Sequence, residues 1–241
     1  MKRNVKNDYI IDLRAHVLPL LAGAHGREDA ADIMHVLRAS GIAAAVATAD
    51  VCLDKTPPRA YAEMEKRARE NLSAVRMRHA PTMFAAAELD LTTDMANIPE
   101  LASLSVGKSR LLLVKLPRQK WKADLLDTLA ALRFADYQPL LANVGAYRPE
   151  AIEELFSLGY KAQLDLSSIA TLDLRRRRRY LRWIDAGNVI ALGSGMTADD
   201  LDNIEAFLRK LRRARKILGH DRLKKLAEHA ELLRGTAESI N

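Results

Sequence analysis

Seven short apolar segments, spread along the whole chain, constrain its fold more than any other feature. They are aliphatic and lack the alternation of polar and apolar positions that is typical of a strand with one wet face. These segments predict strands at residues 9–13, 42–48, 82–88, 110–116, 139–143, 162–166 and 189–193. Apolar residues at helical spacing lie between them and predict helices at residues 27–39, 59–79, 121–134, 149–158 and 172–186.

Strands that are apolar on both faces and joined by helical crossovers indicate a parallel sheet covered by helices. The chain is therefore predicted to be an α/β protein, and a closed or nearly closed (β/α)7 barrel fits it better than an open sheet. No sequence repeat, Gly/Ser linker or low-complexity tract marks a boundary. We expect residues 1–241 to form one domain, since 49% hydrophobic content supports a single packed core.

The sequence also indicates a compartment. Its longest apolar runs, such as residues 41–49, are far too short to span a bilayer, and the opening MKRNVKND lacks the hydrophobic stretch of a signal peptide. Cys52 is the single cysteine, which excludes an internal disulfide and suits a reducing environment. We therefore expect a cytoplasmic protein in which Cys52 is a packing residue.

The net charge of +7 raises the question of an anionic partner. The sharpest basic cluster is LRRRRRYLRWI, in which five consecutive arginines would wrap the whole circumference of a helix and form no single nucleic-acid face. Residues 209–225 alternate cations with leucines and predict a second amphipathic helix. An aromatic content of 5%, with no interleaved stacking platform, argues against nucleic-acid binding. A solvated basic face is the simpler interpretation.

Within LRRRRRYLRWI, the helical spacing predicts which side chains meet the core. Leu174, Leu181 and Ile184 are expected on the buried side. The aliphatic stem of Arg177 or Arg178 is expected to lie across apolar surface. Arg175, Arg179 and Arg182 are then left toward solvent.

The segment DLRAHVLP, at the end of the first predicted strand, resembles the opening motif of a known family. It is similar to D-[IL]-H-x-H-x-L-P of the PHP (polymerase and histidinol phosphatase) superfamily, and in particular of the manganese-dependent tyrosine phosphatases encoded with bacterial capsule and exopolysaccharide genes. GIAAAVATADV, AAAELDL, LLLVKLP, YQPLLANVGAYR, NVIALGSGMT and LAEHAELLRG resemble later motifs of that family, in the same order and at matching spacing. The resemblance implies a PHP-type barrel of seven strands over the whole chain.

The family's chemistry needs a cluster of divalent ions that activates a water and holds a phosphate, and this cluster requires carboxylate and imidazole ligands. Carried over onto this chain, the first histidine becomes Arg14, while the second remains as His16. The P-H-H turn becomes Ala49-Asp50-Val51, which leaves Asp50 as a further acidic candidate, and the glutamate after the third strand remains as Glu88.

The later ligand positions are all changed. The glutamate after the fourth strand becomes Lys115, and the histidine of H-P-E-R becomes Asn143. The Asp and His after the last strand become Gly195 and Thr197, and the phosphate-binding arginine of H-P-E-R becomes Ala146. The resemblance therefore implies a degenerate metal site, with no cofactor where the family uses manganese.

The substitutions suggest that fixed cations replace the metal. Arg14 and Lys115 bring two positive charges, and Glu88 and Asp50 bring two negative charges, so the site can neutralise itself. Because a buried carboxylate is costly unless it is paired, we expect Arg14 and Lys115 to face the barrel mouth and pair with Glu88 and Asp50. The same cations, together with Arg148, are candidates for binding an anionic or phosphorylated ligand.

Two retained side chains have simpler interpretations. His16 could be a hydrogen-bonded core histidine, or the remnant of a ligand set that holds one ion such as zinc with Glu88. Asp12 precedes the motif and is expected to hold a backbone N–H or Arg14. The remaining histidines lie at no metal-binding spacing and are expected on the surface; they are His25, His35, His79, His220 and His229.

Three functions compete at this point. The first is a catalytically inactive PHP-fold protein that acts as a binding or regulatory module, with a partner protein in a surface-polysaccharide pathway. The second is a metal-dependent protein-tyrosine phosphatase with a reduced metal site. The third is nucleic-acid binding through the basic helices. The resemblance also makes self-association into a homo-oligomer an expectation.

Overall fold

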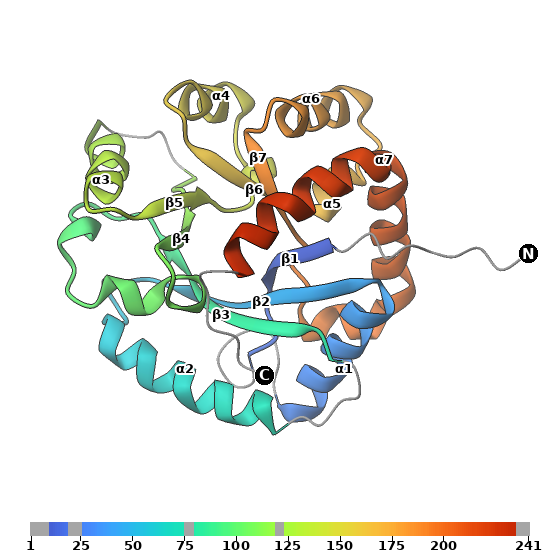
Figure 1. Cartoon of the computed structure of the whole chain (residues 1–241), viewed down its shortest axis with the longest axis horizontal. Helices are drawn as coiled ribbons and strands as arrows, with labels where there is room; N and C mark the ends of the chain where they lie inside the picture. Colours follow the sequence, from blue (N-terminus) through green and yellow to red (C-terminus); the bar gives the residue numbers. More distant parts are fainter. Residues whose placement is uncertain (1–9, 19–25, 75–79, 119–122, 235–241) are drawn as a thin grey trace, which may run out of the picture.

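The strands of the chain close into a single parallel barrel. The computed structural model describes residues 10–18, 26–74, 80–118 and 123–234. Within them seven strands pair in sequence order, and β1 returns to pair with β7 (Figure 1). The strands are β1 Ile10–Ala15, β2 Ile42–Val51, β3 Thr82–Asp90, β4 Leu111–Lys115, β5 Gln138–Leu141, β6 Lys161–Asp165 and β7 Val189–Gly193. The predicted α/β barrel is confirmed.

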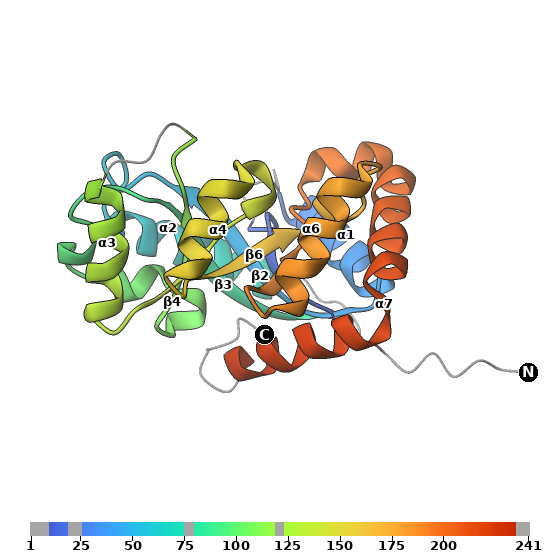
Figure 2. The same cartoon turned by 90° about the horizontal axis from the view of Figure 1, so that it is seen from above.

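Helices surround the barrel and return the chain to the start of each strand (Figure 2). The α-helices are α1 Arg27–Ala39, α2 Pro58–Ser73, α3 Ala123–Phe134, α4 Pro149–Ser157, α5 Leu166–Ile169, α6 Leu174–Asp185 and α7 Ile204–Arg234. Short 3-10 turns complete the connections: η1 Met95–Asn97, η2 Leu101–Leu104, η3 Val106–Lys108, η4 Val144–Ala146 and η5 Ala198–Asn203. None of the described helices is long and apolar enough to cross a membrane.

All seven predicted strands are present, and the differences lie at their ends. β2 continues three residues beyond the predicted end at 48, because it pairs with β3 in unbroken register from Ala44↔Thr82 to Val51↔Leu89. β1 likewise runs to Ala15, so Arg14 lies within the strand rather than after it. Pairing with a neighbour extends a strand past its apolar run, and the polar residues at its end become part of the sheet.

The helix predicted at 59–79 ends earlier, because α2 stops at Ser73 with Ala74 as its C-cap, and residues 75–79 lie outside the described part of the chain. The other helices match their predicted ranges closely, but one side chain of α6 needs a correction. The prediction placed Leu174 of α6 on the buried side, but this side chain is 53% exposed. The buried residues of α6 are Tyr180, Trp183 and Ile184, and Trp183 packs edge-on against Phe156 of α4. These aromatic contacts fix the rotation of the helix, and they turn Leu174 outward.

The arginines and the last helix also differ in detail from the prediction. Arg177 is half-buried and Arg178 is exposed, so Arg177 is the one of the two that lies closer to the core. Arg175 and Arg182 are exposed as expected, and Arg179 is half-buried. The predicted amphipathic helix at 209–225 belongs to the longer α7, which is interrupted at Gly219, where φ is +72°.

Alternate residues of the strands divide between two apolar clusters. One cluster lies between strands and helices, and the other fills the barrel with side chains drawn almost entirely from the strands. The interior cluster consists of Ile11, Leu13, Ala44, Val46, Phe84, Ala86, Val106, Leu111, Leu113, Leu140, Ala142 and Ala191. Continuing in two-residue steps from this cluster toward the strand ends leads to Asp50, Glu88 and Lys115, and Asp165 ends β6. The apolar layers therefore support a charged layer at the barrel mouth.

Candidate functional site

Arg14 is the central cation of the barrel mouth. Leu13 belongs to the interior cluster, so strict alternation would point Arg14 outward, but the pairing of β1 with β2 shifts register between Asp12 and Ala15. Such irregularities re-aim side chains at the rims of barrels. The Arg14 Nε donates to Glu88 Oε2 at 2.6 Å, and its Nη1 lies 3.3 Å from Asp165 Oδ2. The expected pair with Glu88 is present, and Asp165 is a second partner.

Two glycines leave room for this guanidinium. At Gly195, where φ is +64°, an added Cβ would lie 3.0 Å from Arg14 Nη1. At Gly193, an added Cβ would lie 2.7 Å from the Arg14 Cβ and would also collide with the Gln163 amide. A side chain at either position would compete with Arg14 for the same space. The glycine at position 195 and the arginine at position 14 are therefore sterically matched.

A hydrogen-bonded chain continues from Arg14 into the barrel wall. Asp165 accepts a second hydrogen bond from Gln163 Nε2 at 2.8 Å, and Gln163 Oε1 accepts from the backbone N–H of Asn143 at 2.7 Å. Asn143 itself has a positive φ of 45°. The chain links β1, β6 and the turn after β5, so the orientation of Arg14 is fixed from several strands.

Lys115 forms the second ion-pair cluster. Its Nζ lies 2.8 Å from Asp50 Oδ1 and 3.2 Å from Asp90 Oδ1. Asp90 is the direct partner of Lys115 in the β3–β4 register, and Asp50 stands opposite Glu88 in the β2–β3 register. The expected pair with Asp50 is present, and Asp90 is an additional partner. Four carboxylates thus surround the two cations.

Burial controls the ionisation of the acidic groups. It raises the pKa of Glu88 and of Asp165, although Arg14 opposes the shift in both. At Asp50, burial also favours the neutral form, but the hydrogen bond and the charge of Lys115 outweigh it, so the pKa is lowered. Burial opposes the charged form of Lys115, but the hydrogen bonds to Asp50 and Asp90 and their charges outweigh burial. The net result is a raised pKa for Lys115. The contact between Lys115 and Asp50 therefore favours the charged form of both groups.

Asp12 links the first and last strands of the barrel near these ion pairs. Its Oδ1 accepts from the backbone N–H of Arg14 at 3.0 Å and from that of Ser194 at 2.8 Å, which joins β1 to the end of β7. The side chain is fully buried, and burial raises its pKa to about 6 despite the Ser194 hydrogen bonds. The expectation that Asp12 holds a backbone N–H is confirmed.

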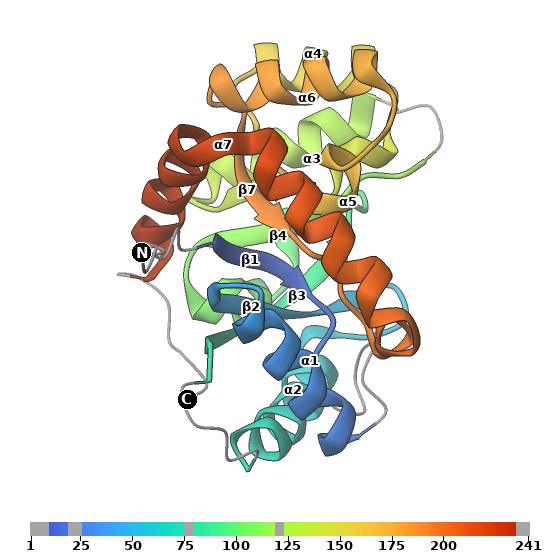
Figure 3. The ribbon, with the colours of Figure 1, turned by 90° about the vertical axis from the view of Figure 1, so that its right-hand side faces the viewer.

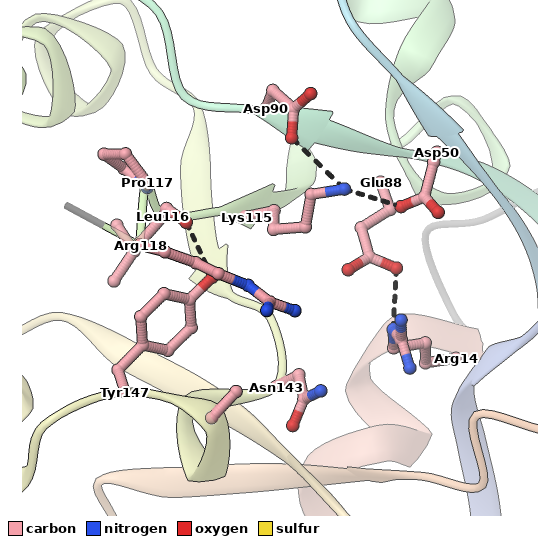
Figure 4. A pocket seen from close by; sticks show the side chains of 11 residues that line it. Arg14, Asp50, Glu88, Asp90, Lys115, Leu116, Pro117, Arg118, Asn143 and Tyr147 are labelled. Atoms are coloured by element: carbon pink, nitrogen blue, oxygen red, sulfur yellow. Dashed lines mark hydrogen bonds and ion pairs between the residues drawn. The ribbon is translucent and has the colours of Figure 1, made fainter.

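A cavity of about 350 Å³ opens above these ion pairs. Figure 4 shows Arg118 and Asn143 pointing toward it, and Tyr147 beside them donates from its hydroxyl to the Leu116 carbonyl at 2.7 Å. No ion pair joins Arg118 to another residue in the described ranges. The lining residues are Arg14, Asp50, Glu88, Asp90, Lys115, Leu116, Pro117, Arg118, Asn143, Ala146 and Tyr147. The cavity is in the lower part of the size range of small-molecule sites.

The other predicted site residues lie in different places. His16 is buried, and burial together with Arg14 lowers its pKa to about 4, so the imidazole is neutral near pH 7. Thr197 caps η5 in a capping box with Asp200 and does not line the cavity. Arg148 precedes α4 with an exposed side chain and also lies outside the lining. His25 and His79 fall outside the described residues.

Sequence reasoning missed three charged contributors: Asp90, Asp165 and Arg118. Asp90 and Asp165 are the last residues of β3 and β6, and the rule that strand ends carry the functional residues would have found both. Arg118 follows the KLP segment and gives no such signal. Among the described residues, no group of three or more His, Cys, Asp or Glu side chains is arranged to hold a metal ion.

The family model for capsular polysaccharide synthesis, CpsB/CapC, matches residues 10–198, well over half of the chain. This chain belongs to the CpsB/CapC family. No curated protein sequence matches this CpsB/CapC member. The sequence-based resemblance to capsule-associated PHP-type phosphatases is thereby confirmed at the level of family.

Solved structures share the fold of this CpsB/CapC member. A structure reported with YwqE from Bacillus subtilis and CpsB from Streptococcus pneumoniae, described as metal-dependent tyrosine phosphatases, is 19% identical with a TM-score of 0.74. The match covers 95% of this chain and 96% of the other. A probable 2-pyrone-4,6-dicarboxylic acid hydrolase from Acinetobacter baumannii is 12% identical over 94% of this chain and 99% of the other, with a TM-score of 0.52. Both comparisons support the barrel fold.

Proposed function

We propose that this chain is a CpsB/CapC member that binds or regulates in a surface-polysaccharide pathway without a catalytic metal centre. The observation that carries the proposal is the Arg14 guanidinium, which bonds to Glu88 and Asp165 inside the barrel mouth. Arginine has no lone pair to offer a metal and stays charged at neutral pH. It therefore occupies carboxylates that would otherwise be free to hold a cation.

The donor set supports the same proposal. Lys115 contacts Asp50 and Asp90, so the three carboxylates that line the cavity, and Asp165 beside them, each contact a fixed cation. Gly195 has no side chain to offer a metal, and the hydroxyl of Thr197 is used in a helix cap. These residues do not fit a cluster of divalent ions. No catalytic step through such a cluster follows from them.

The ligand of this module is proposed to be a small anion held by Arg118. Arg14 and Lys115 each already contact two carboxylates, so a phosphate approaching either would meet negative charge. Arg118 lines the cavity without an ion-pair partner in the described chain, and a guanidinium suits bidentate recognition of phosphate or carboxylate. The proposal therefore adds Arg118 as the principal anion-binding residue, while the sequence-based candidates Arg14, Lys115 and Arg148 stay predictions.

Inorganic phosphate binding measured by calorimetry tests the ligand. We expect Arg118→Ala to abolish the binding heat. Arg148→Ala is the matched control, because it removes an exposed arginine outside the lining. Equal loss in both variants would refute the pocket assignment.

A metal-dependent phosphatase with a reduced site is the second candidate. Two observations favour it: His16 is neutral near pH 7, and no described residue hydrogen-bonds to Glu88 Oε1. Elemental analysis and turnover of p-nitrophenyl phosphate with added manganese distinguish the two functions. We expect no stoichiometric manganese, iron or zinc and no turnover. Robust turnover that is lost in the Arg14→Ala, Lys115→Ala double variant would overturn the metal-free proposal and assign the reaction to this site.

A further inference from the structure

Helix α6 presents a row of unpaired arginines to solvent. Arg175, Arg178 and Arg182 lie three and four residues apart, so they share one face, and all three are exposed. In the described chain none of these three arginines forms an ion pair; the ion pairs of this helix join Arg176 to Asp173 and Asp185 to Arg222. This row lies opposite the buried aromatic face of the helix.

Helix α7, which contacts α6, carries a second row of cations. Arg209, Arg213 and Lys216 are exposed, share one helical face and have no ion-pair partner within the described ranges. The two helices contact each other, and Figure 3 shows them as neighbours on the outside of the barrel. Arg222 and Lys225 of α7 fasten them together by bonding to Asp185 at the end of α6. We call these six cations the α6–α7 basic surface.

Two exposed leucines adjoin this surface. Leu172 is 77% exposed and Leu174 is 53% exposed, immediately before and at the start of α6. Isolated exposed leucines are ordinary, but these two flank Asp173 and precede the arginine row. Because α6 follows β6 in a parallel barrel, its first residues lie at the end of the barrel that carries the cavity.

We propose that the α6–α7 basic surface docks on an anionic lipid bilayer, with Leu172 and Leu174 entering the headgroup region. Unpaired cations on adjacent helices attract a negatively charged membrane, and neighbouring apolar side chains add insertion energy. A free polyanion would use the cations but would gain nothing from the leucines. Nucleic acid would in addition favour aromatic stacking residues, which this surface lacks: neither helical row contains one.

Vesicle co-sedimentation of the full chain tests the proposal. The probes are vesicles of phosphatidylcholine alone and of phosphatidylcholine with an equal part of phosphatidylglycerol, at ~0.1 M and ~0.5 M salt. We expect binding to the anionic vesicles only, and weaker binding at the higher salt. The triple variant Arg175→Gln, Arg178→Gln, Arg182→Gln should bind about 100-fold more weakly, a factor of about five for each arginine.

The control triple is Arg59→Gln, Lys66→Gln, Arg67→Gln on α2. These residues are exposed, the change in net charge is the same, and α2 lies on a different side of the barrel (Figure 1). The control should bind within about three-fold of the unmodified chain, because charge remote from the bilayer contributes little beyond a Debye length. Equal weakening of both triples would refute a localised docking surface.

The variant Leu172→Ser, Leu174→Ser separates a bilayer from a soluble polyanion. We expect it to weaken vesicle binding about ten-fold while leaving retention on heparin unchanged, since burial of apolar surface operates only at the membrane. Circular dichroism should be unchanged in every variant, because all the substituted side chains are exposed. Vesicle binding unaffected by the leucine changes would overturn the membrane proposal in favour of a polyanion surface.

Discussion

At the scale of single residues, the Arg14–Glu88 pair determines what the barrel mouth can do. Glu88 is fully buried, and burial raises its pKa and so favours the neutral carboxyl. The guanidinium at 2.6 Å supplies the compensating charge. Such pairs add little net stability over an apolar substitute, but removing one partner is costly.

Glu88→Ala is therefore expected to lower the free energy of unfolding by about 3 kcal/mol, because it leaves Arg14 with Asp165 as its remaining carboxylate. Chemical denaturation measures this change. The control is Glu228→Ala, which removes the exposed partner of Lys224 and should cost less than about 0.5 kcal/mol. An unchanged denaturation midpoint in Glu88→Ala would contradict the pairing argument.

Asp12 makes folding depend on pH. Its pKa is raised from 3.8 to about 6 in the folded chain, so the folded state binds more protons between these values, and stability falls as pH rises through that window. Asp12→Asn keeps the Oδ1 acceptor and cannot ionise. The variant's free energy of unfolding relative to the wild type should rise by about 2–3 kcal/mol between about pH 4 and about pH 7. If the free energies of unfolding of the two proteins changed with pH in parallel, the raised pKa of Asp12 would be contradicted.

At the scale of elements, the end of β7 is shaped around Arg14. Gly193 and Gly195 sit where β7 ends, and the backbone N–H of Gly195 donates to the Arg14 carbonyl at 2.8 Å. β7 can approach Arg14 this closely because neither residue carries a side chain. The absence of a side chain at position 195 therefore leaves the space that the Arg14 guanidinium occupies.

Gly195→Ala tests that coupling. The positive φ should cost about 1–2 kcal/mol in the free energy of unfolding, and the contact with Arg14 Nη1 should add to this. Gly187→Ala is the control, since Gly187 has a φ of +70° but nothing within 4 Å of an added Cβ. In an Arg14→Ala background, the two glycine substitutions should cost the same. If Gly195→Ala still lowered the free energy of unfolding more than Gly187→Ala in that background, Arg14 would not be the cause of the difference.

At the scale of the whole molecule, the barrel closes where its first strand, β1, pairs with its last strand, β7. β1 and β7 share a single register pair, Asp12↔Leu192, supplemented by the Asp12–Ser194 hydrogen bond and by α7, which contacts both strands. Opening this seam would expose two strand edges and the interior cluster at once. The barrel should therefore lose its structure as one unit.

Thermal unfolding is expected to be a single transition. Far-UV circular dichroism reports on all the elements, while fluorescence of the buried Trp183, in a Trp121→Phe variant, reports on α6 and its surroundings. The two midpoints should coincide, as cooperative unfolding of one domain requires. Separate midpoints would divide the chain into independently folding parts.

The sequence by itself determined the α/β class, the seven strands and their parallel pairing. These follow from local apolar patterning, which is legible in the order of residues. The family resemblance implied six altered ligand positions near the strand ends, and the high cost of burying an unpaired charge then predicted that Arg14 and Lys115 pair with Glu88 and Asp50. The structure contains both pairs.

Only the tertiary structure decided which other groups meet at the mouth. Asp90 and Asp165 complete the two ion-pair clusters, Arg118 faces the cavity in place of Arg148, and Leu174 turns outward because Trp183 and Phe156 set the rotation of α6. Each of these depends on register, on a bulge in β1 or on packing between distant helices. Such contacts join residues far apart in the chain, and their geometry is set by the closed barrel rather than by any local run of sequence.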